Sequence, residues 1–64
     1  MLHIGDRVIY TPLNSTKEYL ATVIQIIGTT DKMPIIQFDD DMPYPQGQPT
    51  MYINFIESLQ KLSN

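Results

Sequence analysis

The sequence feature that most constrains this chain is that its 64 residues include no cysteine and a single histidine. A domain of this size buries only about 60% of the surface that its unfolded chain exposes, so it usually needs a disulfide, a metal, dense packing or a partner subunit. The composition excludes disulfides and cysteine-based zinc sites, and His3 alone cannot form a histidine cluster. We therefore expect one domain over residues 1–64, stabilised by apolar packing or by self-association, with no cofactor and no metal.

Five segments are typical of β-strands. The longest apolar stretch, Tyr19–Ile27, would fit a buried helix by periodicity alone, but its β-branched residues and the following Gly28 favour a strand. The segment Asp6–Thr11 is β-branched and aromatic and ends at Pro12. The other strands are expected over Met33–Phe38, Thr50–Ile53 and Ile56–Leu62.

The segment Tyr19–Ile27 has apolar residues on both faces of the expected strand. Strict alternation places Leu20, Ile24 and Ile26 on one face and Ala21, Val23 and Ile27 on the other. A barrel core needs only one such face. The surplus either covers a second subunit or reflects a bent strand that is buried at both ends.

The connections between these strands contain turn-forming residues. The segment 39–49 holds three consecutive aspartates, three prolines and Gly47, which excludes regular structure. It is either a contact arm anchored by Tyr44 or a mobile connector. A 3₁₀ turn is expected at Asn54-Phe55, and a short amphipathic helix from Asn54 is the alternative for the tail. The pattern predicts an all-β fold, a small five-stranded barrel.

The order of these pieces resembles the SH3-like barrels of the Tudor and KOW groups. The resemblance spans Gly5 to Leu62 and is carried by Gly5-Asp6-Arg7-Val8-Ile9-Tyr10, Ala21-Thr22-Val23, Ile35-Ile36-Gln37-Phe38-Asp39 and Phe55-Ile56-Glu57-Ser58-Leu59. Within that group, Tyr19-Leu20-Ala21-Thr22-Val23 is similar to the second strand of Tudor domains. The resemblance implies an aromatic cage built from Tyr19 and Phe38 and closed by Asp39–Asp41 and Tyr44. It also suggests a bacterial or phage origin, where free-standing barrels of this size are familiar.

The residues themselves point to a binding surface for a cation. Aromatic faces attract cations by ~0.5–2 kcal/mol, and nearby carboxylates add to that attraction. The candidate partner-binding residues are Tyr10, Tyr19, Phe38, Asp39, Asp40, Asp41 and Tyr44. The alternative is that Phe38 and Tyr52 are core residues and that the other tyrosines are half-buried strand residues. The three aspartates are expected to form a solvated acidic turn, because their spacing does not suit a calcium loop.

Charge and motifs narrow the function further. The net charge is −3, and the cations Arg7, Lys17, Lys32 and Lys61 are scattered, so a KOW-like nucleic-acid module would need them to converge after folding. No motif supplies a nucleophile with a neighbouring base, so we expect no enzyme.

No apolar run approaches the ~20 residues that span a bilayer, and no signal-peptide pattern occurs at the start. We expect a cytoplasmic protein-interaction module that binds a basic or methylated segment of another protein. If Met1 is the natural start, the chain would serve as a small adaptor or inhibitor. A nucleic-acid-binding module and a structural homo-oligomer remain the alternatives.

Overall fold

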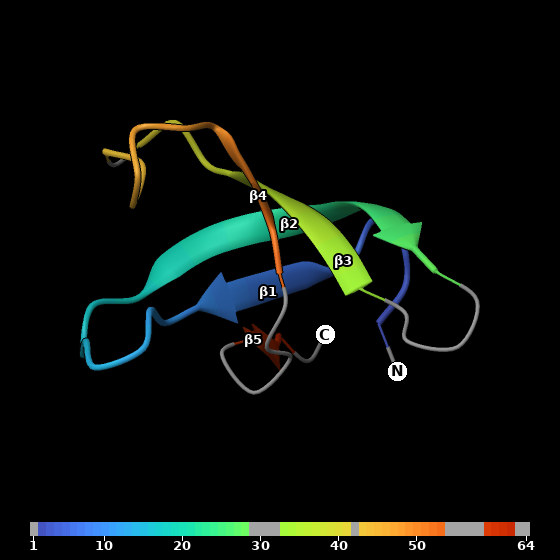
Figure 1. Cartoon of the computed structure of the whole chain (residues 1–64), viewed down its shortest axis with the longest axis horizontal. Helices are drawn as coiled ribbons and strands as arrows, with labels where there is room; N and C mark the ends of the chain where they lie inside the picture. Colours follow the sequence, from blue (N-terminus) through green and yellow to red (C-terminus); the bar gives the residue numbers. More distant parts are fainter. Residues whose placement is uncertain (1, 29–32, 42, 54–58, 63–64) are drawn as a thin grey trace.

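Five antiparallel strands form one sheet in this computed structural model, which describes residues 2–28, 33–41, 43–53 and 59–62 (Figure 1). The strands are β1 (Arg7–Tyr10), β2 (Tyr19–Ile27), β3 (Met33–Phe38), β4 (Thr50–Tyr52) and β5 (Leu59–Lys61). Their order in the sheet is β4-β3-β2-β1-β5, so the last strand pairs with the first. The all-β class is confirmed, and no helix occurs within the described ranges. The arrangement is compatible with a small β-barrel-like fold.

The strand boundaries follow the sequence closely where the strands are long. The observed β2 and β3 coincide with the predicted segments, and β1 and β4 are slightly shorter than predicted. The strand β5 occupies the latter part of Ile56–Leu62, where the helical alternative is therefore wrong for Leu59–Lys61. The 3₁₀ turn expected at Asn54-Phe55 lies outside the described residues.

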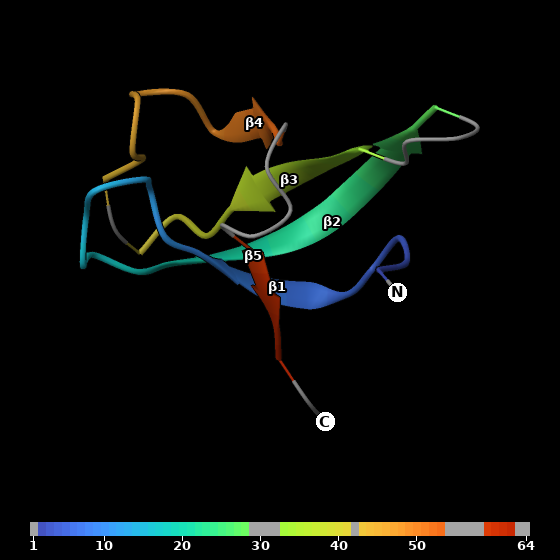
Figure 2. The same ribbon diagram turned by 60° about the horizontal axis from the view of Figure 1, so that its bottom comes forward.

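The sheet is strongly twisted rather than flat. In Figures 1 and 2 the edge strands β4 and β5 run across the direction of β2. Within the described part of the chain, no backbone pairing joins β4 to β5. The sheet therefore curls around its core without a continuous ladder that closes it.

A β-bulge bends the long strand β2. The pairing with β3 shifts between Val23 and Gln25, which leaves Ile24 as the extra residue. Ala21 and Val23 are buried before the bulge, whereas Ile26 packs against the core after it. The strict alternation that placed Ile26 with Leu20 and Ile24 is wrong, because one inserted residue exchanges the two faces of the strand. The bulge thus accounts for part of the apolar surplus in this segment.

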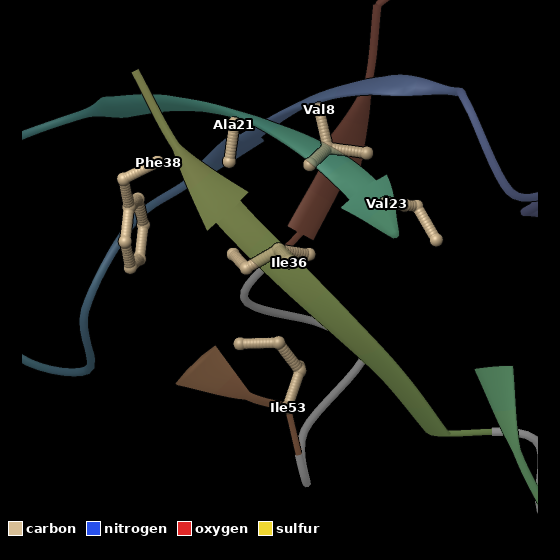
Figure 3. Packing of buried hydrophobic residues seen from close by; sticks show 6 residues of the cluster. All are labelled: Val8, Ala21, Val23, Ile36, Phe38 and Ile53. Carbon is tan, nitrogen blue, oxygen red and sulfur yellow. The ribbon is translucent and has the colours of Figure 1, made fainter. Parts of the chain in front are cut away.

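The core lies on the concave side of this bent sheet. Figure 3 shows side chains from β1, β2 and β3 converging with Ile53, the residue that follows β4. Leu59 of β5 packs against the same cluster. Burying an aliphatic or aromatic side chain contributes about 1.5–3 kcal/mol relative to leaving it exposed. The buried core comprises Val8, Ala21, Val23, Ile36, Phe38 and Ile53.

Two connections leave the sheet at the same end. The register pairs Tyr10 with Tyr19 and Ala21 with Phe38, so segments 11–18 and 39–49 both start from this end. The first contains a turn in which Asn14 has a φ of 64°, a left-handed conformation that asparagine tolerates. In the second, the Gly47 amide donates to the Tyr44 carbonyl across a turn. This end of the sheet carries most of the predicted site residues.

Candidate functional site

Four aromatic rings gather at the end of β3. Phe38, the last residue of β3, is only 4% exposed. Its ring centroid lies 5.8 Å from that of Tyr10, 6.0 Å from that of Tyr19 and 6.5 Å from that of Tyr44. Such tilted pairs favour packing between rings. The structure therefore brings the four predicted aromatic residues together around a buried Phe38.

Tyr52 lies apart from this cluster. It belongs to β4, is 44% exposed, and its hydroxyl donates to the sulfur of Met33 over 3.1 Å. The alternative that placed both Phe38 and Tyr52 in the core is thus confirmed for Phe38 and wrong for Tyr52. The difference follows from position, because Phe38 faces the concave side of the sheet and Tyr52 lies on an edge strand.

Asp39 forms a bidentate ion pair with Arg7 on the sheet surface. Arg7 Nη1 donates to Asp39 Oδ1 over 2.8 Å and Nη2 donates to Oδ2 over 2.6 Å, while Nη1 also bonds Thr22 Oγ1 over 2.7 Å. Because the Arg7 guanidinium donates to the carboxylate and attracts it, the pKa of Asp39 lies below its usual 3.8. Both carboxylate oxygens of Asp39 are already engaged within the chain.

Asp40 is engaged with the neighbouring connection. The Tyr44 hydroxyl donates to Asp40 Oδ1. This hydrogen bond, together with partial desolvation and the negative charge of Asp40, raises the pKa of Tyr44 above 10.0. The contact holds Tyr44 in place at the edge of the aromatic cluster.

A hollow of about 260 Å³ opens beside these residues. We call it the acidic hollow, because its lining includes three carboxylates and no lysine or arginine. The rest of the lining is apolar or aromatic. The lining residues are Ile9, Glu18, Tyr19, Leu20, Phe38, Asp39, Asp41 and Pro43.

The acidic hollow contains only part of the predicted site. Tyr19, Phe38, Asp39 and Asp41 line it, whereas Tyr10, Asp40 and Tyr44 do not. Sequence reasoning missed Glu18, although it directly precedes Tyr19 in the chain. It also missed three apolar residues, of which two become neighbours only through the β1–β2 register. These three residues are Ile9, Leu20 and Pro43.

The electrostatic balance around the acidic hollow is negative. Two cations stand near it: Arg7 on Asp39, and Lys17, whose Nζ lies 5.5 Å from the centroid of the Tyr19 ring. The four carboxylates of Glu18 and Asp39–Asp41 set against these two cations leave a formal charge of −2. This charge is complementary to a cation rather than to an anion.

The cations of the chain do not form a basic patch in the described structure. Arg7 pairs with Asp39, and Lys61 Nζ lies 3.5 Å from Asp6 Oδ2. Lys17 lies against Tyr19, and Lys32 is outside the described residues. No specific observation therefore favours phosphate binding.

The residues that the structure describes contain no group of three or more ligating side chains arranged for a metal ion. The same residues include no helix of the length and apolar character required to cross a bilayer.

Comparison of the chain with protein-family models, with curated proteins and with solved structures yields no match in any of the three.

Proposed function

We propose that this protein is a non-enzymatic interaction module whose acidic hollow receives a basic side chain from a partner protein. The observation that carries the proposal is the lining itself, an apolar and aromatic wall with three carboxylates and no cation. Lysine and arginine carry a charged head on an aliphatic stem, so they match both parts of such a lining. We also propose that the sheet is an SH3-like barrel of the Tudor/KOW type, supported by its five antiparallel strands and its curl around one core. A cytoplasmic location stays a prediction.

The size of the acidic hollow suits one side chain. Pockets for drug-sized molecules typically enclose ~300–1,000 Å³, and this hollow encloses about 260 Å³. Its walls come from β1, the start of β2 and the segment after β3, which the sheet register holds together. A small site on a paired framework favours recognition of one residue of an extended partner segment.

The direct test is an NMR shift titration of the labelled protein with a short arginine- and lysine-containing peptide. We expect shifts at Glu18, Tyr19, Leu20 and Asp41, with affinity that decreases as salt rises. Removal of the Asp41 charge by Asp41→Asn should weaken binding several-fold.

The matched control for this substitution is Asp40→Asn. It removes the same charge from the same run of aspartates, but Asp40 does not line the acidic hollow, and asparagine can still accept from the Tyr44 hydroxyl. Equal weakening by both variants would indicate general charge attraction instead of a site. The absence of shifts with any basic peptide at low salt would refute the proposed function.

A further inference from the structure

The chemistry of the acidic hollow also selects among basic side chains. We infer that it takes an unmethylated arginine, whose N–H groups bond its carboxylates, and that it discriminates against trimethyl-lysine and dimethylarginine. The inference rests on the proposed function and names the ligand of the same site.

The aromatic faces near the acidic hollow are largely occupied within the chain. The Phe38 ring is surrounded by Tyr10, Tyr19 and Tyr44 and is only 4% exposed. The Tyr19 ring already carries the Lys17 ammonium, 5.5 Å from its centroid. A trimethylammonium has no N–H donor and depends on open aromatic faces for its recognition. Of the two rings that line the hollow, Phe38 is therefore buried and Tyr19 already has a cation beside it.

The carboxylates of the hollow favour a ligand that carries N–H donors. Both oxygens of Asp39 already accept from Arg7, whereas in the described structure Glu18 and Asp41 take part in no side-chain hydrogen bond and no close ion pair, and Asp41 attracts Arg7 only over a longer distance. These two residues stand at different walls of the hollow, one before β2 and the other after β3. A ligand that reaches both must present several N–H donors, and hydrogen bonds between charged partners are the strong ones.

Arginine meets this requirement better than lysine. Its planar guanidinium has five N–H donors in a fixed fork, whereas the lysine ammonium is a compact and strongly hydrated charge. The Arg7 contact with Asp39 and Thr22 shows the same chemistry within the chain at the edge of the hollow. Symmetric dimethylation keeps the charge of arginine but replaces two of its five N–H donors with methyl groups, which interferes with two-point hydrogen bonding to a carboxylate.

The test uses four peptides that differ only at one central residue, which is arginine, symmetric dimethylarginine, lysine or trimethyl-lysine. Affinities are measured by NMR shift titration on the full chain at low salt. We expect arginine to bind most tightly, lysine a few-fold more weakly, and each methylated peptide at least tenfold more weakly than its unmethylated counterpart. The two arginine peptides carry equal charge, so their difference reports the N–H donors.

Two variants test whether Lys17 weakens the binding of trimethyl-lysine by occupying the Tyr19 ring. Lys17→Met removes the cation from this ring and should reduce the difference in affinity between the lysine and trimethyl-lysine peptides. The control Lys61→Met removes the same charge from β5 and should leave this difference in affinity unchanged. Silence with all four peptides would refute the proposed function itself. Binding of either methylated peptide as tightly as its unmethylated counterpart, or of lysine more tightly than arginine, would refute only the ligand preference.

Discussion

Arg7 and Asp39 illustrate how individual residues connect distant parts of this small chain. Arg7 begins β1 and Asp39 follows β3, yet their side chains meet above Thr22 of β2. From the sequence, Asp39 is predicted to join a partner-binding cluster and Arg7 to be a possible phosphate contact. Their pairing was not predictable, because the contact depends on the lateral order of three strands. In the structure they form an internal ion pair that joins β1 to the segment after β3.

The contribution of this ion pair to stability depends on pH, because the pKa of Asp39 is lowered in the folded protein. Its folded-state pKa is below 3.8, so its contribution to stability is present above pH ~3.8 and is lost as the pH falls through the folded value. A half-exposed pair of this kind contributes about 0.2–1 kcal/mol. The difference in urea unfolding between the wild type and Arg7→Gln should therefore be largest near neutral pH and should shrink as the pH falls through the folded pKa of Asp39, leaving the part that comes from the Arg7–Thr22 hydrogen bond. A difference that persists undiminished in acid would contradict the assignment.

Phe38 packs against each of the other three rings of the aromatic cluster. Its replacement by alanine should cost about 3–5 kcal/mol, a large part of the ~3–10 kcal/mol expected for a domain of this size. The milder Phe38→Leu should lower the free energy of unfolding by about 1–2 kcal/mol while the protein stays folded. Urea denaturation followed by tyrosine fluorescence measures this loss. Tyr52→Phe, at an exposed position, is the control and should change stability by less than about 0.5 kcal/mol.

Single elements were predictable to the extent that their pattern is local. β2 and β3 are long and rich in β-branched residues, so composition alone located them. The bulge at Ile24 was not predictable, because every residue from Val23 to Ile27 except Gln25 is apolar and the sequence carries no mark of an inserted position. Sequence reasoning therefore found the strand but placed Ile26 and Ile27 on the wrong faces beyond it.

The bulge gives neighbouring residues of β2 very different exposure to solvent. Val23 is fully buried and Ile24 is 40% exposed. Val23→Ala should lower the free energy of unfolding by more than about 1.5 kcal/mol, since it removes two buried methyl groups at ~0.8 kcal/mol each and leaves a cavity. Ile24→Thr should cost less than about 0.5 kcal/mol. Thermal unfolding of both variants measures the contrast, and equal losses would place Ile24 in the core.

The candidate site is formed by residues from several strands and depends on how the whole molecule folds. Its aromatic members were predictable because large aromatic side chains of a small chain gather where the core meets the surface. The apolar wall of the acidic hollow was not, since Ile9 and Leu20 meet only through the β1–β2 register. The sequence thus predicted aromatic and acidic residues for a candidate site, and the strand order determined which of them line the acidic hollow.

Net charge gives a prediction for the molecule as a whole. The chain carries −3, and each cation in its described part already has an acidic or aromatic neighbour. Binding to DNA depends mainly on cations that neutralise phosphates. We expect no retardation of a short mixed-sequence duplex in a gel-shift assay at low salt. Retardation that weakens steeply with added salt would instead support the nucleic-acid alternative.

The pairing of β5 with β1 has a consequence for how fast the chain folds. Val8 pairs with Lys61, 53 positions later in the sequence, so the edge of the sheet cannot form until nearly the entire chain has been drawn together. Loop-closure entropy opposes such distant pairing, and domains dominated by it fold in milliseconds to seconds, whereas helical bundles of similar size fold in microseconds to milliseconds. We therefore expect stopped-flow refolding of this chain to take milliseconds or longer, and refolding that is complete within the dead time of the instrument would contradict this expectation.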